Sequence, residues 1–350
     1  MTLNIDLSLL PILLLATPSS IPPIHTAAAL GTYTDTEPAL PSVLGILLDA
    51  CRLCLGMQRG LNPAALNQGE FPACAAMTTG YVFRVENHAT VMYLQKIGRT
   101  GHLTTLDVHP PPPPPPPPRR SHGRPPRTWF SLSSMPVLLL VTSSTLTTPP
   151  PSLALMTSLS CLLLSRILAI ISLRARTSPP SWHGAPEPGV PGDLLVLLSE
   201  DRWIRMRGLV DDLKAVTSGA WLARPRNPAL MDALDWIAHM AVYLAVVALA
   251  GASDGEKVML LGAVVASHLA LMYENSTVDG LVMNGRTVTQ GSVKKYPRRL
   301  DMAEELVEEV GRSDFAVRLG LINPDKVAEK KETEKDGLSV VGPGQEVVTM

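Results

Sequence analysis

The sequence predicts a mainly α-helical membrane protein, built on a two-helix transmembrane hairpin with small cytosolic β-hairpin and helix elements. Two charge-poor apolar blocks, residues 236–252 and 258–273, stand on either side of a polar turn at residues 253–257. Charged residues make up 17% of the chain and aromatic residues 4%, which fits membrane segments better than one large soluble core. A run of prolines at residues 110–118 predicts a disordered, Pro-rich N-terminal half.

The N-terminal region, residues 1–107, has weak apolar segments and no well-defined organisation. Residues 3–16 resemble the apolar part of a secretory signal, but they lack a basic start and are interrupted by an acidic residue and a proline. Residues 40–55 are a weak helix candidate. The β-branched and aromatic residues of 79–94 predict a short strand pair.

Residues 108–191 form a low-complexity segment rich in Pro, Ser and Leu. Within it, residues 108–186 contain seven Arg but no Lys, Asp or Glu. Two interpretations stay open: a disordered polyproline II linker, or a stretch that is not genuine coding sequence. Residues 152–173 are long enough to cross a bilayer as a third span, with Arg166 costing about 2.5–3.5 kcal/mol if it is central.

Small ordered elements are predicted before the hairpin, in residues 192–228. Two short strands, 193–198 and 202–207, are separated by a polar turn, and an amphipathic helix follows at 209–217. These elements are expected to form a small cytosolic β/α unit.

A second small unit is predicted after the hairpin, in residues 274–324. An Asn-Gly turn inside residues 280–289 indicates a β-hairpin. Amphipathic helices are expected at 300–310 and 314–319. The Lys/Glu-rich and then Gly/Pro-rich tail, residues 325–350, is predicted to be disordered.

The apolar hairpin, residues 229–273, is the most informative part of the sequence. Its two blocks are apolar on every face, and small residues recur at spacings that let helices approach closely. Extension back to residue 230 gives the first helix about 23 residues, enough to span with some tilt. The alternative is that the two blocks are helices in the water-free core of a soluble protein. We expect the hairpin to lie in a lipid bilayer, in a membrane that the sequence does not name.

Basic residues predict the orientation of this hairpin. Arg224 and Arg226 precede it, five basic residues between 286 and 299 follow it, and the turn contains only Lys257. The positive-inside rule therefore places both ends in the cytosol. The sequon at Asn275 should then face the cytosol and stay unmodified.

Two histidines in the hairpin are the weak candidates for a functional site. His239 and His268 lie at similar distances from the turn, within about 3 Å of the same depth in an antiparallel pair. Asp235 and Glu274 lie at the same end. One hypothesis is a shared metal, haem or proton-relay site. The alternative is that these are ordinary polar residues near helix ends.

No other signature indicates catalysis or a cofactor. The sequence contains no GxSxG, P-loop or HExxH motif, and no GxGxxG after a strand. Cys51 and Cys54 form a CxxC without a redox or zinc context. Neither half of the chain has the basic excess of a nucleic-acid-binding protein. No catalytic residue, metal ligand or cofactor is predicted.

Two segments of the sequence resemble known proteins. They are residues 201–222, DRWIRMRGLVDDLKAVTSGAWL, and residues 294–322, KKYPRRLDMAEELVEEVGRSDFAVRLGLI. Together with the hairpin, over about residues 192–325, they resemble uncharacterised multi-pass membrane proteins of filamentous fungi. The resemblance implies a membrane-embedded helical pair flanked by small cytosolic β/α pieces, with no assigned functional residues.

The function that the sequence favours is non-enzymatic: an integral membrane scaffold or accessory subunit. Its expected partners are the lipid bilayer and either another membrane protein or a second copy of the chain. A transporter-like or channel-like component is the second hypothesis. A membrane enzyme using a His239/His268 metal or haem site is the third.

Overall fold

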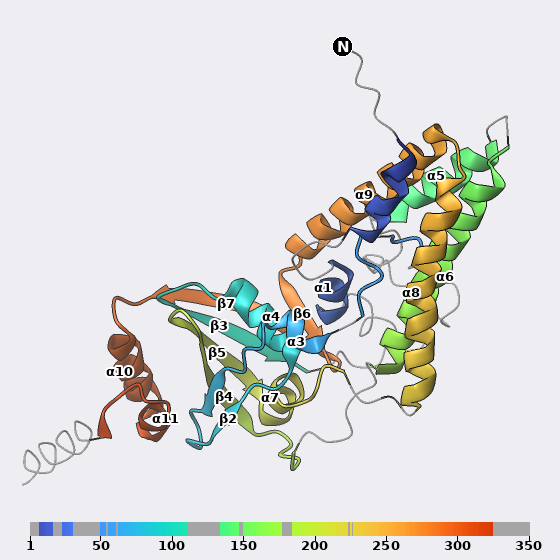
Figure 1. Ribbon diagram of the computed structural model, residues 1–350. Coiled ribbons are helices and arrows are strands. Elements are labelled where there is room, and N and C mark those ends of the chain that lie inside the picture. The colour runs from blue at the N-terminus through green and yellow to red at the C-terminus, as the bar shows by residue number, and fades with distance from the viewer. Residues whose placement is uncertain are drawn as a thin grey trace, which may run out of the picture.

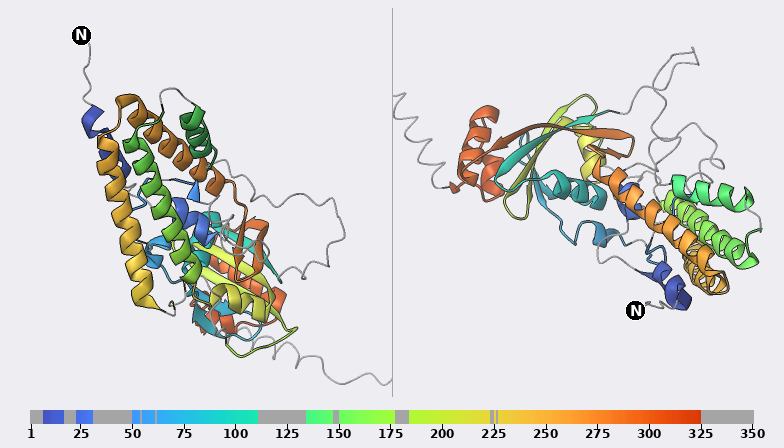
Figure 2. Two further views of the ribbon diagram at one scale, coloured as in Figure 1. Left: turned by 90° about the vertical axis from the view of Figure 1, so that its right-hand side faces the viewer. Right: turned by 90° about the horizontal axis from the view of Figure 1, so that it is seen from above.

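The computed structural model consists of a mixed β-sheet with covering helices and a helical bundle beside it (Figure 1). Figure 2 shows the same two parts from the side and from above. The structure describes residues 7–16, 23–30, 50–53, 55–60, 62–110, 134–146, 150–176, 184–222, 225 and 227–324. The predicted disordered tail, nearly all of the proline run, and Cys54 of the CxxC lie outside these residues.

The sheet draws its seven strands from three distant parts of the chain. Its order is β2-β1-β4-β5-β3-β7-β6. Strands β3 and β5 run parallel, whereas every other neighbouring pair is antiparallel. The strands are β1 (Ala73–Ala76), β2 (Val82–Arg84), β3 (His102–His109), β4 (Pro191–Leu198), β5 (Arg202–Leu209), β6 (Gly280–Met283) and β7 (Arg286–Lys295).

This sheet overturns the predicted fold class, because the molecule is not a two-helix hairpin with small separate β-hairpins. The two predicted hairpins do form, as β4–β5 and β6–β7. Each leaves a row of unpaired backbone groups at its edge, and β3 pairs with both edges. The units predicted at 192–228 and 274–324 are therefore parts of one sheet. The N-terminal region, predicted to be poorly organised, supplies three of its strands.

Alternating side chains of the strands form two cores on opposite faces of the sheet. Val196, Ile204 and Leu106 belong to one buried cluster, which α4 (His88–Ile97) and α7 (Val210–Thr217) cover. Leu195 and Trp203 belong to the other. The helices over that second face are α10 (Arg299–Val310) and α11 (Asp314–Arg318). The period of two along each strand places neighbouring residues on opposite faces.

The strand pair predicted within residues 79–94 is wrong. Strand β2 pairs with β1, which precedes it, and residues from His88 onward form α4. The helix begins there because the Asn87 side chain accepts a hydrogen bond from the Thr90 backbone N–H at 3.0 Å. Asn87 also donates to the Gly219 carbonyl at 2.7 Å, which ties the start of the helix to the end of α7.

The helical bundle contains the apolar segments of the chain. Its long helices are α6 (Leu153–Arg176), α8 (Pro228–Ala250) and α9 (Asp254–Ser276). Two shorter helical elements, η1 (Leu7–Leu15) and α5 (Met135–Leu146), pack against them. The predicted helices at 152–173 and in the hairpin are thus confirmed as helices. Both helical segments are insertions into the sheet: α5–α6 between β3 and β4, and α8–α9 between α7 and β6.

Helix α8 packs along α6 and has hardly any contact with α9, although α9 follows it directly in the chain. The two helices α6 and α8 run antiparallel, and α9 diverges from them toward the sheet (Figure 1). Ser158 on α6 donates a hydrogen bond to the Ala245 carbonyl on α8 at 2.9 Å. At the far end, Ser152 donates to Glu256 at the start of α9. The antiparallel α8–α9 packing expected from the sequence is therefore wrong.

Candidate functional site

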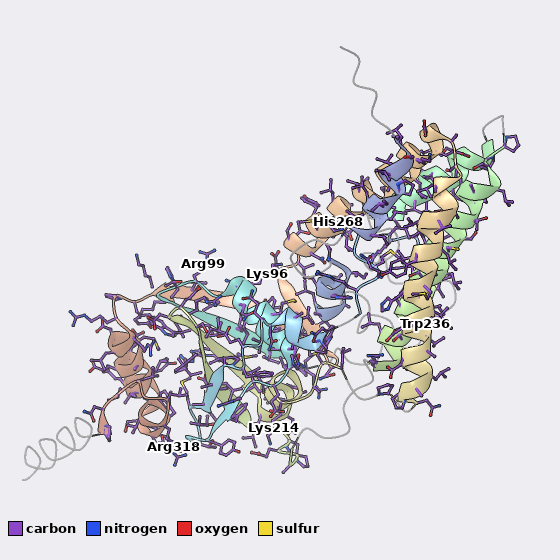
Figure 3. The ribbon with its side chains drawn as sticks, in the orientation of Figure 1. Lys96, Arg99, Lys214, Trp236, His268 and Arg318 are labelled. Carbon is purple, nitrogen blue, oxygen red and sulfur yellow. The ribbon has the colours of Figure 1, made fainter. Side chains whose placement is uncertain are left out.

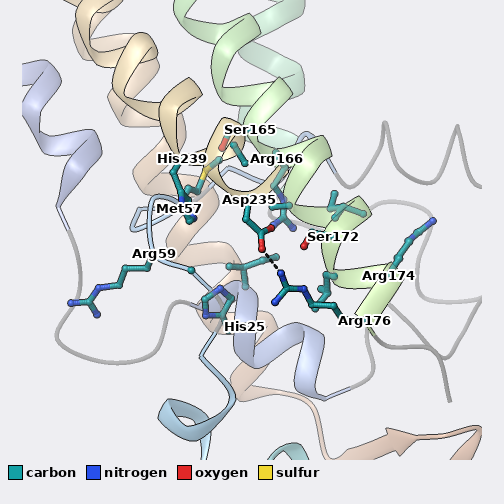
Figure 4. A pocket seen from close by; sticks show the side chains of 16 residues that line it. His25, Met57, Arg59, Ser165, Arg166, Ser172, Arg174, Arg176, Asp235 and His239 are labelled. Atoms are coloured by element: carbon teal, nitrogen blue, oxygen red, sulfur yellow. Dashed lines mark hydrogen bonds and ion pairs between the residues drawn. The ribbon is translucent and has the colours of Figure 1, made fainter. Parts of the chain in front are cut away.

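A pocket of about 70 Å³ lies at the sheet-facing end of the bundle. Its walls come from α6 and α8, from the short helix α1 (Pro23–Ala29) and from the segment around Met57 and Gly60. Figure 4 shows the lining side chains from close by. Among them are four arginines and two histidines, against a single carboxylate: Arg59, Arg166, Arg174, Arg176, His25, His239 and Asp235.

Helical spacing explains why these side chains meet. On α6, Arg166 and Arg176 stand ten residues apart with Ala169, Ile170 and Leu173 between them, so one face of the helix carries all five. Asp235, Ala238 and His239 share one face of α8 in the same way. The antiparallel packing of α6 on α8 then brings the end of one helix beside the start of the other.

One ion pair spans the pocket. Arg176 Nη2 lies 2.5 Å from Asp235 Oδ2 and 3.6 Å from Asp232 Oδ1. The Arg176 side chain is 20% exposed, and its Nε is buried without a hydrogen-bond partner among the described residues. A guanidinium has five donors in a fixed fork, and both of these carboxylate contacts fall on Nη2. Arg176 therefore keeps an N–H donor available inside the pocket.

The four arginines are not equivalent. In Figure 4 the side chains of Arg166 and Arg176 extend toward Asp235, whereas those of Arg59 and Arg174 point away from the centre of the pocket. Arg166 is only 3% exposed, although it lies near the middle of α6. The interior of the pocket thus holds two guanidinium groups and one carboxylate, with the other two arginines at its rim.

The electrostatics of the pocket act on His25. Burial, together with the positive charge of Arg166, lowers the pKa of His25 to about 4 from a usual value of about 6.5. His25 is therefore a neutral imidazole at pH 7, with one nitrogen able to donate and the other able to accept a hydrogen bond. A bound anion would oppose the effect of Arg166 and favour the charged form of the imidazole.

This pKa predicts how His25 affects stability. Between about pH 6.5 and pH 4 the unfolded chain binds a proton that the folded chain does not, so stability falls as the pH falls through this range. Through this effect the wild type should lose about 2 kcal/mol of stability between about pH 7 and pH 5. The variant His25→Gln should not show this loss. The measurement is the melting temperature of the full chain in detergent at the two pH values. An equal drop in the wild type and the variant would contradict the prediction.

The structure does not bring the predicted histidine pair into one site. His239 lines the pocket, together with Asp235. His268, labelled in Figure 3, is buried on α9, and neither it nor Glu274 is among the lining residues. The two histidines separate because α8 packs on α6 instead of α9. Within the described part of the chain, no group of three His, Cys, Asp or Glu side chains could hold a metal ion.

Sequence reasoning missed the other members of the pocket. Arg166 was treated only as a cost of inserting α6 into lipid, and Arg176 and His25 were not considered. One signal was available, because Arg166 and Arg176 share a face of a predicted helix. His25 gave no signal, since its place depends on how the N-terminal segment packs against the bundle.

The chain matches no family model, no curated protein and no solved structure. The resemblance to fungal multi-pass membrane proteins therefore stays a prediction. Inferences about function rest on the helices and the pocket.

Proposed function

We propose that the protein is an integral membrane protein in which the bundle of α6, α8 and α9 inserts into a bilayer and holds the sheet at the membrane surface. The observation that carries this proposal is the length and composition of these three helices, with 24, 23 and 23 residues, each long and apolar enough to span. Packing within the protein buries only 28% of the most apolar stretch of α8. Most of its apolar surface therefore needs another apolar environment.

The exposed side chains of the bundle support a lipid-facing surface. Soluble proteins rarely expose contiguous apolar patches of this extent. On α8, Leu244 is 60% exposed and Val247 is 71% exposed. Further exposed apolar residues are Leu153, Met156, Leu164 and Ile171 on α6, Trp236, Ile237 and Tyr243 on α8, and Val258, Met259, Val265, Leu269, Met272 and Tyr273 on α9.

The sheet-facing ends of the helices have the features of a membrane boundary on the cytosolic side. Arg174 and Arg176 end α6 there. Trp236 near the start of α8 and Tyr273 near the end of α9 are each 63% exposed, as in the aromatic belts of membrane proteins. With the positive-inside rule, these residues support a cytosolic sheet.

The structure adds a packing constraint at the sequon residue Asn275. Its side chain is 9% exposed, and its Nδ2 donates a hydrogen bond to the Pro23 carbonyl at 2.7 Å. The nitrogen that would carry the glycan is thus buried against α1. A glycan at Asn275 would remove this contact, so a modified Asn275 would contradict both this packing and the cytosolic orientation.

The role we propose for this arrangement is a non-catalytic scaffold or accessory subunit. The two helical insertions anchor a sheet whose edge strands are β2 and β6, and the sheet is held beside the bilayer. A membrane protein partner, or a second copy of the chain, would meet the sheet or the outer faces of the bundle.

Extraction of membranes with alkaline carbonate tests the proposal. The full chain should stay in the membrane pellet, and release into the supernatant would overturn the integral assignment. The double variant Leu244→Lys, Val247→Lys should lower the membrane-inserted fraction, because a lysine in the centre of a span costs about 2.5–3.5 kcal/mol. Ala229→Lys, at the exposed start of α8, is the matched control and should insert like the wild type. Unchanged insertion of the double variant would show that α8 does not face lipid.

A further inference from the structure

We propose that the pocket between α1, α6 and α8 binds a phosphate group through Arg166 and Arg176. The phosphate could belong to a lipid headgroup or to a free phosphate anion. This inference goes beyond the scaffold role proposed above. Only the assignment to a lipid headgroup depends on the membrane-spanning arrangement.

The charge of the pocket favours an anion. Two guanidinium groups reach the interior, where Asp235 is the single carboxylate among the lining residues. Asp235 is already paired with Arg176 at 2.5 Å. Guanidinium groups bind phosphate oxygens in a bidentate manner, and these charge-assisted hydrogen bonds are among the strongest in proteins.

An unused donor of Arg176 points to the same ligand. The Nε of Arg176 is buried, with no acceptor among the described residues. A buried donor without a partner is rare in folded proteins and indicates a missing acceptor. An oxyanion with several acceptor oxygens can satisfy this donor while Asp235 keeps its contact with the Nη2 of the same guanidinium.

The volume of the pocket and its position along the helices restrict the ligands that could bind. A cavity of about 70 Å³ is several times the minimum for one water, so it admits a compact oxyanion while the rest of a larger ligand stays outside. The pocket extends along α6 from Arg166, near the middle of the helix, to Arg176 at its sheet-facing end. In a protein embedded in the bilayer, the end that holds Arg176 lies at the level of the lipid headgroups.

Asp235 gives the proposal a test that misfolding cannot imitate. Its carboxylate occupies one side of Arg176 and repels an incoming anion. Asp235→Asn removes that charge and can still accept a hydrogen bond from the guanidinium. We therefore expect this variant to bind phosphate more tightly, whereas a damaged fold would bind it more weakly.

The experiment uses the full chain purified in dodecyl maltoside, a detergent without phosphate, and measures binding isotherms. The probes are inorganic phosphate and a short-chain phosphatidic acid. Arg176→Gln should weaken binding by about tenfold or more, because it removes a charge-assisted contact. Arg99→Gln is the control, with the same loss of charge at an exposed site outside the pocket, and it should change binding by less than about threefold. Asp235→Asn should tighten binding by about threefold or more.

The outcomes separate the two sources of phosphate. Binding of phosphatidic acid that is tighter than that of inorganic phosphate by more than about tenfold assigns a lipid headgroup. Similar binding of both probes assigns a free oxyanion. Absence of binding for both probes overturns the proposal. Binding that Arg176→Gln and Asp235→Asn leave unchanged also overturns it, since the anion then sits elsewhere. Because the chain has been extracted from the membrane, none of these results depends on the carbonate test.

Discussion

Replacing Phe315 by alanine is expected to destabilise the sheet by about 3–5 kcal/mol. Phe315 on α11 is fully buried, and it belongs to the cluster that packs α10 and α11 onto the sheet with Trp203 and Met302. Alanine would lose the buried aromatic surface and leave a cavity, because the strands beneath it cannot collapse into the space.

Thermal unfolding of the full chain in detergent measures this effect. Trp203 lies in the same cluster, so its fluorescence reports the packing of this face. The variant should melt roughly 6 °C or more below the wild type. Val317→Ala on the same helix is the matched control, because Val317 is only partly buried, and its loss should stay below about 1 kcal/mol. Equal melting temperatures for the two variants would contradict the role given to Phe315.

Replacing Arg205 by methionine is expected to cost about 3 kcal/mol or more. The Arg205 side chain is 6% exposed, and its Nη2 lies 2.5 Å from Asp193 Oδ2 on the neighbouring strand β4. Its Nη1 lies 2.6 Å from Glu309 on α10. Removal of the guanidinium would leave Asp193, only 17% exposed, as a nearly buried charge without its closest partner. That uncompensated charge is the main source of the loss.

Two comparisons separate this loss from a general loss of charge. Arg207→Met removes a neighbouring arginine that is 46% exposed and lies near the same two carboxylates, and it should cost less than about 1 kcal/mol. Adding Asp193→Leu to Arg205→Met should recover most of the loss, because an apolar pair can replace a buried ion pair. A double variant as unstable as Arg205→Met would contradict the charge explanation.

The same network predicts a dependence on acid. The hydrogen bond from Arg205 holds the pKa of Glu309 below its usual value. The stability that this pair contributes is therefore present above the usual glutamate pKa and is lost as the pH falls through the lowered value. In Arg205→Met this part of the acid sensitivity should disappear, which melting curves of both proteins at acidic pH would show.

Local elements were predictable because their signals lie within a few residues. The polar turn between β4 and β5 and the Asn-Gly turn between β6 and β7 each fix a hairpin by their own chemistry. The apolar periodicity of α7 and α10 fixes which faces are buried. The sequence places β4, β5, β6, α7 and α10 within one or two residues of their bounds in the structure, whereas β7 continues six residues beyond the predicted end at 289.

Assembly of the sheet was not predictable in the same way. Strand β3 precedes β5 by about a hundred residues, and the parallel register Leu106 with Met206 appears in no local pattern. Strand β1 and the start of α4 were hidden in a region with weak signals. Pairing between distant strands depends on which edges remain open after the hairpins form, so it is a property of the whole chain.

In the candidate site, too, the local elements were predictable and their packing was not. The sequence by itself determined three apolar helices, the arginines on one face of α6, and the polar residues at the start of α8. Only the tertiary structure decided that α8 packs on α6, which joins Arg176 to Asp235 and leaves His268 apart. The physical reason is that helical periodicity fixes which face of an apolar helix carries a residue. It does not fix which neighbour covers that face, because every apolar partner satisfies the same pattern.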